Sequence, residues 1–123
     1  MQDFRNLKVW VRAHSLTLAA YQSTQVFPKE EQYGLTAQIR RSAASICANI
    51  AEGCGRGSKV DFARFLHIAF GSASELEYHL ILASDLQYLQ RRVYESLNRA
   101  VIEVKRMLAS LIRRLREPPA TDH

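Results

Sequence analysis

The residues with the clearest chemical meaning are the cations that gather in the last quarter of the chain. Eight of the 17 lysines and arginines lie between residues 90 and 117 beside only three acidic residues, so this segment carries the whole net charge of +5. Arginine binds phosphate through paired hydrogen bonds, and clustered cations attract polyanions. We predict a nucleic-acid-binding set here, and a solvated arginine-rich helix face is the alternative. The set is Arg91, Arg92, Arg99, Lys105, Arg106, Arg113, Arg114 and Arg116.

A second group of polar residues lies in and after segments that are otherwise rich in alanine and isoleucine. A buried amide or carboxylate without a hydrogen-bond partner is strongly destabilising, so such residues must be paired if they face inward. We predict a structural polar network, and a binding site is the alternative. The group is Asn49, Glu52, Arg56 and Glu75.

Patterns typical of enzymes and metal sites are incomplete. Glu75 and His79 are four residues apart, but a carboxylate-bridged metal site in a helical bundle needs Glu-x-x-His pairs from two helices. Cys47 lies in an apolar stretch, and Cys54 has no histidine near it in sequence. The glycine-rich residues 53–57 lack the Lys-Ser/Thr ending of a phosphate-binding loop. We therefore predict a protein that is not an enzyme and has no metal or cofactor.

Length and composition set the class of protein. A chain of 123 residues with 47% hydrophobic residues is long enough for one domain with a single core. Two cysteines are too few for a secreted disulfide framework, which favours a reducing compartment. The sequence has no run of about 18 apolar residues. We expect a cytoplasmic protein that does not interact with membranes.

Apolar residues recur every three to four positions along four segments, a spacing that predicts four helices. Short connections make sequential helices antiparallel, so the expected fold is an all-α, up-down-up-down four-helix bundle. We assign residues 1–117 to the bundle and residues 118–123, with Pro118 and Pro119, to a flexible C-terminal tail. The predicted helices cover about 7–27, 35–52, 58–86 and 90–115. The expected inward residues of the second helix are Leu35, Ile39, Ala43, Ile46 and Ile50, and those of the fourth are Tyr94, Leu97, Val101, Val104, Leu108, Leu111 or Ile112, and Leu115.

Three local features refine this prediction. The glycine-rich residues 53–57 are expected to form the C-cap of the second helix and a loop, with a glycine in the left-handed conformation, and Gly71 is expected to mark the close approach of another helix. The third helix is apolar on most of its circumference, which suggests contact with another subunit. The first helix is expected to turn inward Leu7, Trp10, His14, Leu18 and Tyr21, with Val11 and Ala20 beside them.

Four separate blocks of the sequence resemble the four-helix bundle proteins encoded in 23S ribosomal RNA intervening sequences. The likeness spans roughly residues 4–90, and the blocks occur in the same order. They are FRNLKVWVRAH at residues 4–14, YGLTAQIRRSA at 33–43, NIAEGCGR at 49–56 and FARFLHIAFGSASELE at 62–77.

This resemblance implies a four-helix protomer in a ring-like homopentamer. It also points to a relative, the accessory variability determinant of diversity-generating retroelements, a basic pentamer that binds a reverse transcriptase and nucleic acid. The last helix lies outside the blocks, so its arginines rest on charge alone. We expect a homo-oligomer that binds structured RNA or ribosomal RNA through this helix. The alternative is a scaffold that docks a protein partner, such as a reverse transcriptase, through the same face.

Overall fold

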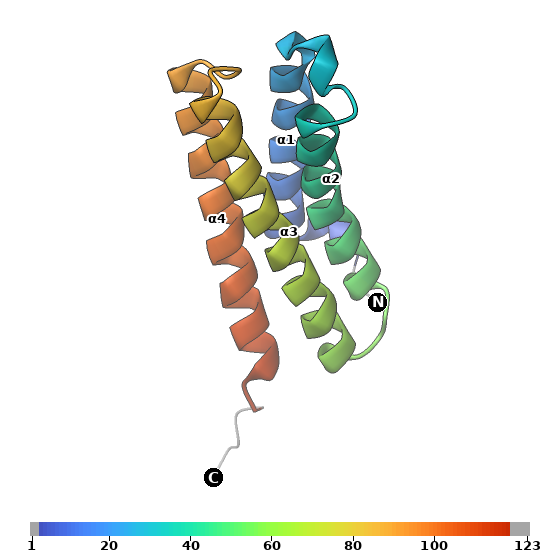
Figure 1. Cartoon of the computed structure of the whole chain (residues 1–123). Helices are drawn as coiled ribbons and strands as arrows, with labels where there is room; N and C mark the ends of the chain where they lie inside the picture. Colours follow the sequence, from blue (N-terminus) through green and yellow to red (C-terminus); the bar gives the residue numbers. More distant parts are fainter. Residues whose placement is uncertain (1–2, 119–123) are drawn as a thin grey trace.

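Short connections turn the chain back on itself three times and place four long helices side by side (Figure 1). The computed structural model describes residues 3–118, and every regular element in that range is helical. Each helix packs on the next, and the last packs on the first, which confirms the predicted all-α four-helix bundle. The predicted tail lies outside the described residues except for Pro118. The helices are α1 (Lys8–Ser23), α2 (Leu35–Cys54), α3 (Lys59–Asp85) and α4 (Arg91–Arg116).

Hydrogen bonds from side chains define where two of the helices begin. Ser58 precedes α3, and its hydroxyl accepts a hydrogen bond from the Asp61 N–H at 3.1 Å, as expected for an N-cap. Glu31 lies in a short 3-10 turn before α2 and accepts from the Leu35 N–H at 3.0 Å. The second carboxylate oxygen of Glu31 accepts from the Tyr88 O–H at 3.0 Å. Glu31 therefore connects the start of α2 to the turn between α3 and α4.

The core is aliphatic and confirms the predicted inward faces of α2 and α4. The predicted stripe of α2 is buried along its whole length, from Leu35 to Ile50. On α4 the structure selects Ile112 over Leu111 as the last fully inward residue. Large side chains that are almost completely buried include Leu16, Ile39, Ile46, Ile50, Leu66, Leu76, Leu80 and Leu108.

The predicted inward face of the first helix is wrong for Val11, His14, Leu18 and Tyr21, which are exposed, whereas Leu7 and Trp10 pack against the core and Ala20 is buried. Leu18 is 54% exposed and Tyr21 is 42% exposed, whereas a stripe of smaller residues is buried. The reason is the close approach of α2: the Thr17 hydroxyl donates to the Ala13 carbonyl at 2.8 Å and lies 3.1 Å from the Ala43 carbonyl of α2. Small side chains allow this contact and bulky ones do not. The buried residues of α1 are Val9, Ala13, Leu16, Thr17 and Ala20.

The glycine-rich residues 53–57 end α2 as expected, and Gly57 supplies the left-handed residue with a φ of 86°. The role predicted for Gly71 is wrong, because the close helix approach occurs at Gly53, which lies inside α2. A Cβ atom at position 53 would lie only 2.7 Å from the Cβ of Phe65 in α3, so the close helix approach occurs here. At Gly71, by contrast, no heavy atom of the described residues lies within 4 Å of such a Cβ, apart from its chain neighbours and the adjacent helix backbone.

We predict that Gly53→Ala lowers the free energy of unfolding by about 1–3 kcal/mol, because the added methyl group overlaps the Cβ of Phe65 and must push α2 and α3 apart. Urea denaturation followed by circular dichroism measures this change. Gly55→Ala is the matched control, since its Cβ would meet only ordinary contacts at 3.7 and 3.8 Å. Equal stability of the two variants would contradict the prediction.

The Glu31 contact predicts a high pKa for one tyrosine. The hydrogen bond to the Glu31 carboxylate favours the protonated phenol and raises the pKa of Tyr88 above its usual value of about 10. A raised pKa in the folded state means that this contribution to stability is present below about pH 10 and is lost as the pH rises through the folded-state pKa.

Titration of phenolate absorbance checks this pKa, with Tyr88→Phe used to assign the transition. Glu31→Gln should lower the pKa of Tyr88 toward its usual value. Glu30→Gln should have a smaller effect, because Glu30 acts on Tyr88 only through a weaker electrostatic interaction. A Tyr88 transition that is unchanged in Glu31→Gln would show that the hydrogen bond is not maintained in solution.

Candidate nucleic-acid interface

Four of the predicted cations form a regular row along the outer face of α4. Arg92, Arg99, Arg106 and Arg113 are spaced seven residues apart, and all four are exposed. Seven residues make nearly two helical turns, so these side chains point in similar directions. At 1.5 Å per residue, neighbouring members are about 10.5 Å apart and the row is about 32 Å long. We call these four residues the arginine row.

No member of the arginine row has an ion pair or a side-chain hydrogen bond within residues 3–118. Arg114, one position beyond the row, is likewise without such a partner in the described part of the chain. These five guanidinium groups can bind an anion without breaking an existing contact. The unpaired guanidinium groups therefore form the part of α4 best suited to phosphate.

The other three predicted cations already have partners. Arg91 forms an ion pair with Glu95 at 3.1 Å. Lys105 is only 24% exposed and pairs with Glu77 of α3 at 2.8 Å. Arg116 donates to Nε2 of His67 at 2.9 Å. Arg91 is therefore paired within α4, whereas Lys105 and Arg116 join α4 to α3. The sequence did not indicate the contacts of Lys105 and Arg116, because their partners come from another helix.

The opposite face of α4 explains why the arginines point outward. Leu97, Val101, Val104 and Leu108 are buried in the core, so the remaining face is left to charged residues. Tyr94 is the one aromatic residue of α4 and is half-buried. The face therefore offers positive charge and no exposed ring on which a base can stack.

Two hollows with apolar walls lie on either side of the C-terminal part of α4. The first hollow, of about 460 Å³, lies between α4 and the start of α1, and none of the described residues that line it carries a carboxylate: they are Asn6, Leu7, Lys8, Val9, Arg106, Met107, Ser110, Leu111 and Arg114. The second hollow, of about 370 Å³, lies between α4 and α3 and is lined by His67, Phe70, Ala109, Ile112, Arg113 and Arg116.

The structure brings together two members of the second polar group, Glu52 and Arg56. The two residues are four positions apart in sequence, and Nε of Arg56 lies 3.6 Å from a carboxylate oxygen of Glu52. Both side chains are about half exposed. The Arg56 guanidinium also lies over the ring of Phe65, 5.0 Å from its centre. Arg56 thus covers the place where α3 meets the end of α2.

The other two members lie along the seam between α2 and α3. The Asn49 amide donates to the Ser45 carbonyl at 2.8 Å, and the Ser45 hydroxyl lies 2.9 Å from that of Ser72 in α3. Glu75 forms an ion pair with Arg41 of α2. The four residues of this group therefore make three separate sets of contacts, all of which link or terminate α2 and α3.

The residues considered for catalysis or metal binding are placed as follows. Burial raises the pKa of the Cys47 thiol, which disfavours the nucleophilic thiolate. Nδ1 of His79 is buried without a hydrogen-bond partner in the described part of the chain, and Glu75 faces Arg41 instead. Within residues 3–118, no three histidine, cysteine, aspartate or glutamate side chains converge on a common point.

None of the described helices has the length and hydropathy needed to cross a bilayer.

The protein is thus a small all-α four-helix bundle with one strongly basic outer helix. The chain belongs to the 23S rRNA-intervening sequence protein family, whose model matches residues 5–110. It is similar to a crystal structure of a protein of unknown function from the S23 ribosomal protein family of Bacteroides thetaiotaomicron, with 31% identity and a TM-score of 0.77. That match covers 85% of this chain and 95% of the other. No curated protein matches the chain.

Proposed function

We propose that the protein is a non-enzymatic, homo-oligomeric RNA-associated protein that contacts the phosphates of structured RNA, ribosomal RNA in particular, through α4. The observation that carries this proposal is the arginine row, in which four exposed guanidinium groups lie along one helix without ion-pair partners in the described chain. Phosphate contacts of this kind fix the position of a nucleic acid without reading its sequence. The name of the family, which refers to 23S ribosomal RNA, supports RNA as the polyanion.

The lack of exposed aromatic residues on α4 favours a folded RNA over a single strand. Proteins that bind single strands use aromatic side chains as stacking platforms, whereas double-stranded RNA is recognised mainly by its shape and its backbone. A regularly spaced row of charges about 32 Å long suits the rigid backbone of a helical RNA.

Two exposed apolar faces support assembly of several copies. The face on α3 includes Val60, Ile68 and Tyr78, which are 81%, 43% and 58% exposed. The face on α1 includes Val11 and Leu18, which are 47% and 54% exposed. Monomeric proteins rarely leave such groups of apolar residues uncovered.

The positions of these two faces favour a ring. Because α1 and α3 each pack on α2 and on α4, they occupy opposite corners of the bundle (Figure 1). Two different faces on opposite sides allow head-to-tail contacts, which close into a ring when the rotation between copies permits it. A pentamer is the ring size that the family resemblance suggests. Assembly would bring several copies of α4 to one RNA.

The arginine row predicts how RNA binding depends on salt. Replacing Arg99, Arg106 and Arg113 by glutamine should weaken binding of an rRNA fragment and reduce the slope of log K against log salt by about 2–3, since each phosphate contact contributes about 0.9. Mobility shift at several salt concentrations measures the slope. No retention of structured RNA by the unmodified protein at low salt would overturn the proposal.

A matched control for this experiment replaces three arginines that belong to other elements than α4 and already form ion pairs. Arg5, Arg56 and Arg64 pair with Asp3, Glu52 and Asp61, and their change to glutamine removes the same number of positive charges. The slope should stay unchanged in this control. An equal loss in both variants would mean that RNA responds to net charge and not to the row.

A substitution at Gly71 tests the proposed assembly, because Gly71 lies on the exposed side of α3 beside the exposed apolar face of that helix. In an isolated protomer, Gly71→Ala should stabilise α3 by about 0.5–1 kcal/mol, since alanine is the better helix former. In an assembly that packs a neighbour against this face, the added methyl group should instead shift the oligomer toward smaller species. Analytical ultracentrifugation distinguishes the two, with Gly55→Ala as the control that leaves the mass unchanged. A wild-type protein that sediments as a single protomer would refute the assembly.

A further inference from the structure

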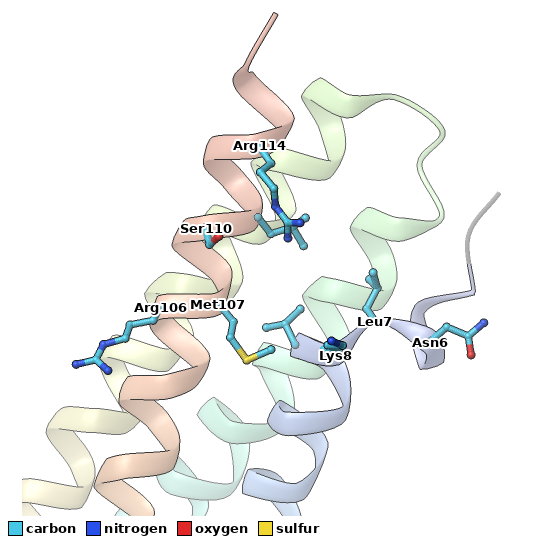
Figure 2. Close-up of a pocket in the computed structure, with 9 residues that line it drawn as sticks. Asn6, Leu7, Lys8, Arg106, Met107, Ser110 and Arg114 are labelled. Carbon is cyan, nitrogen blue, oxygen red and sulfur yellow. The ribbon is translucent and has the colours of Figure 1, made fainter. Parts of the chain in front are cut away.

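The seam between α1 and α4 is hollowed along much of its length. The hollow of about 460 Å³ lies at the start of α1, and a second hollow of about 390 Å³ continues further along the same two helices. We call the two hollows together the α1/α4 groove. Figure 2 shows Met107 and Arg114 reaching from α4 toward the start of α1, whereas Arg106 points away from the groove. The second hollow is lined by Arg12, Ser15, Leu16, Ala19, Ser96, Leu97, Arg99, Ala100 and Glu103.

The floor and rim of this groove have different chemistry. Aliphatic side chains line the floor, together with Met107, a flexible residue that adapts to varied apolar partners. The rim carries cations without ion pairs in the described chain, namely Lys8, Arg99 and Arg114. Among the described residues that line the groove, Glu103 is the one carboxylate, and Arg12 already neutralises it at 2.8 Å.

The size of the groove suits a helix. It extends from Lys8 to Ala19 on α1 and from Ser96 to Arg114 on α4, which corresponds to about 17 Å and about 27 Å of helix. Several lining residues are small, so the backbone of a third helix can approach closely. An amphipathic helix laid into a groove of this type places its apolar side chains at spacings of three and four residues on the floor.

We propose that the α1/α4 groove binds an acidic amphipathic helix of a partner protein. The aliphatic side chains of the partner helix cover the aliphatic floor of the groove, and its carboxylates pair with the unpaired cations of the rim. None of the described residues that line the groove is aromatic, so the floor offers little to an unpaired RNA base. This inference does not depend on the proposed RNA binding.

The distribution of acidic residues in this chain excludes a second copy of it as the occupant of the α1/α4 groove. Nearly all described acidic side chains of the protein are already bound to a cation or to a hydroxyl group. Only Glu30, Asp85 and Glu117 lack such a contact within residues 3–118, and they lie at the ends of helices or in a turn. No face of the described chain presents the row of free carboxylates that the rim requires, so the complementary charge must come from a different protein.

The probe is a synthetic helical peptide of about 16 residues, roughly 24 Å long, built from leucine and glutamate with leucines every three or four residues. Fluorescence anisotropy of the labelled peptide with the full-length protein at low salt measures its affinity. A peptide of the same composition with the leucines dispersed around the helix is the first control. We expect the amphipathic peptide to bind roughly tenfold tighter or better, and equal or absent binding of both would overturn the proposal.

Paired protein variants locate the binding site. Lys8→Glu with Arg114→Glu reverses two cations of the groove rim, whereas Arg92→Glu with Arg113→Glu makes the same charge change outside it. The first pair should weaken peptide binding at least about tenfold, and the second should leave it nearly unchanged while weakening RNA binding. Equal loss of peptide binding in both pairs would mean general attraction to a basic protein and would overturn the proposal.

A further variant fills the groove without altering charge. Ser15 is exposed and lines the second hollow, so Ser15→Trp should block the peptide and leave the fold intact. Sedimentation of this variant should match that of the wild type. If Ser15→Trp instead breaks an assembly of the protein, a second copy occupies the groove and the proposal is wrong. If it abolishes RNA retention but not peptide binding, the groove is an RNA site and the proposal is equally wrong.

Discussion

The contact between Gly53 of α2 and the aromatic residues Phe62 and Phe65 of α3 determines how the rest of the bundle is arranged. It brings these two helices so close that a methyl group at position 53 would overlap the Cβ of Phe65. Further along the same seam, Ser45 and Ser72 are within hydrogen-bonding distance. With α2 and α3 closely joined, the shorter α1 leaves parts of α4 uncovered. The hollows between α1 and α4 therefore lie opposite the tight seam between α2 and α3.

The arginine row is compatible with a stable fold because its members are exposed and far apart. Neighbours in the arginine row are about 10.5 Å apart, a distance close to the Debye length of about 8–10 Å at physiological salt, so their mutual repulsion is largely screened. Val101, Val104 and Leu108 anchor the other face of α4 in the core. Burial on one side of the helix thus holds the guanidinium groups in place without neutralising them. Their charge remains available to an external anion.

Much of the fold could be predicted because α2 and α4 each contain one clear apolar stripe. On α1 two stripes compete, and hydrophobicity alone favoured the bulky one through Trp10 and Leu18. Packing selected the stripe of Ala13 and Ala20 because only small residues allow α2 to come close. The positions of the cations could likewise be predicted from sequence. Which of them are free could not, because the partners Glu77 and His67 lie on another helix, far away in sequence.

The seven-residue spacing of the arginine row also gives it a direction in space. Because an α-helix has 3.6 residues per turn, each interval of seven residues falls about 20° short of two full turns, so the row rotates by roughly 60° from Arg92 to Arg113. Consistent with this rotation, Arg99 lines the hollow on the α1 side of α4, and Arg113 lines the hollow on the α3 side. The charges therefore follow a shallow left-handed path across α4. A stiff polyanion that contacts all four would lie oblique to the bundle axis.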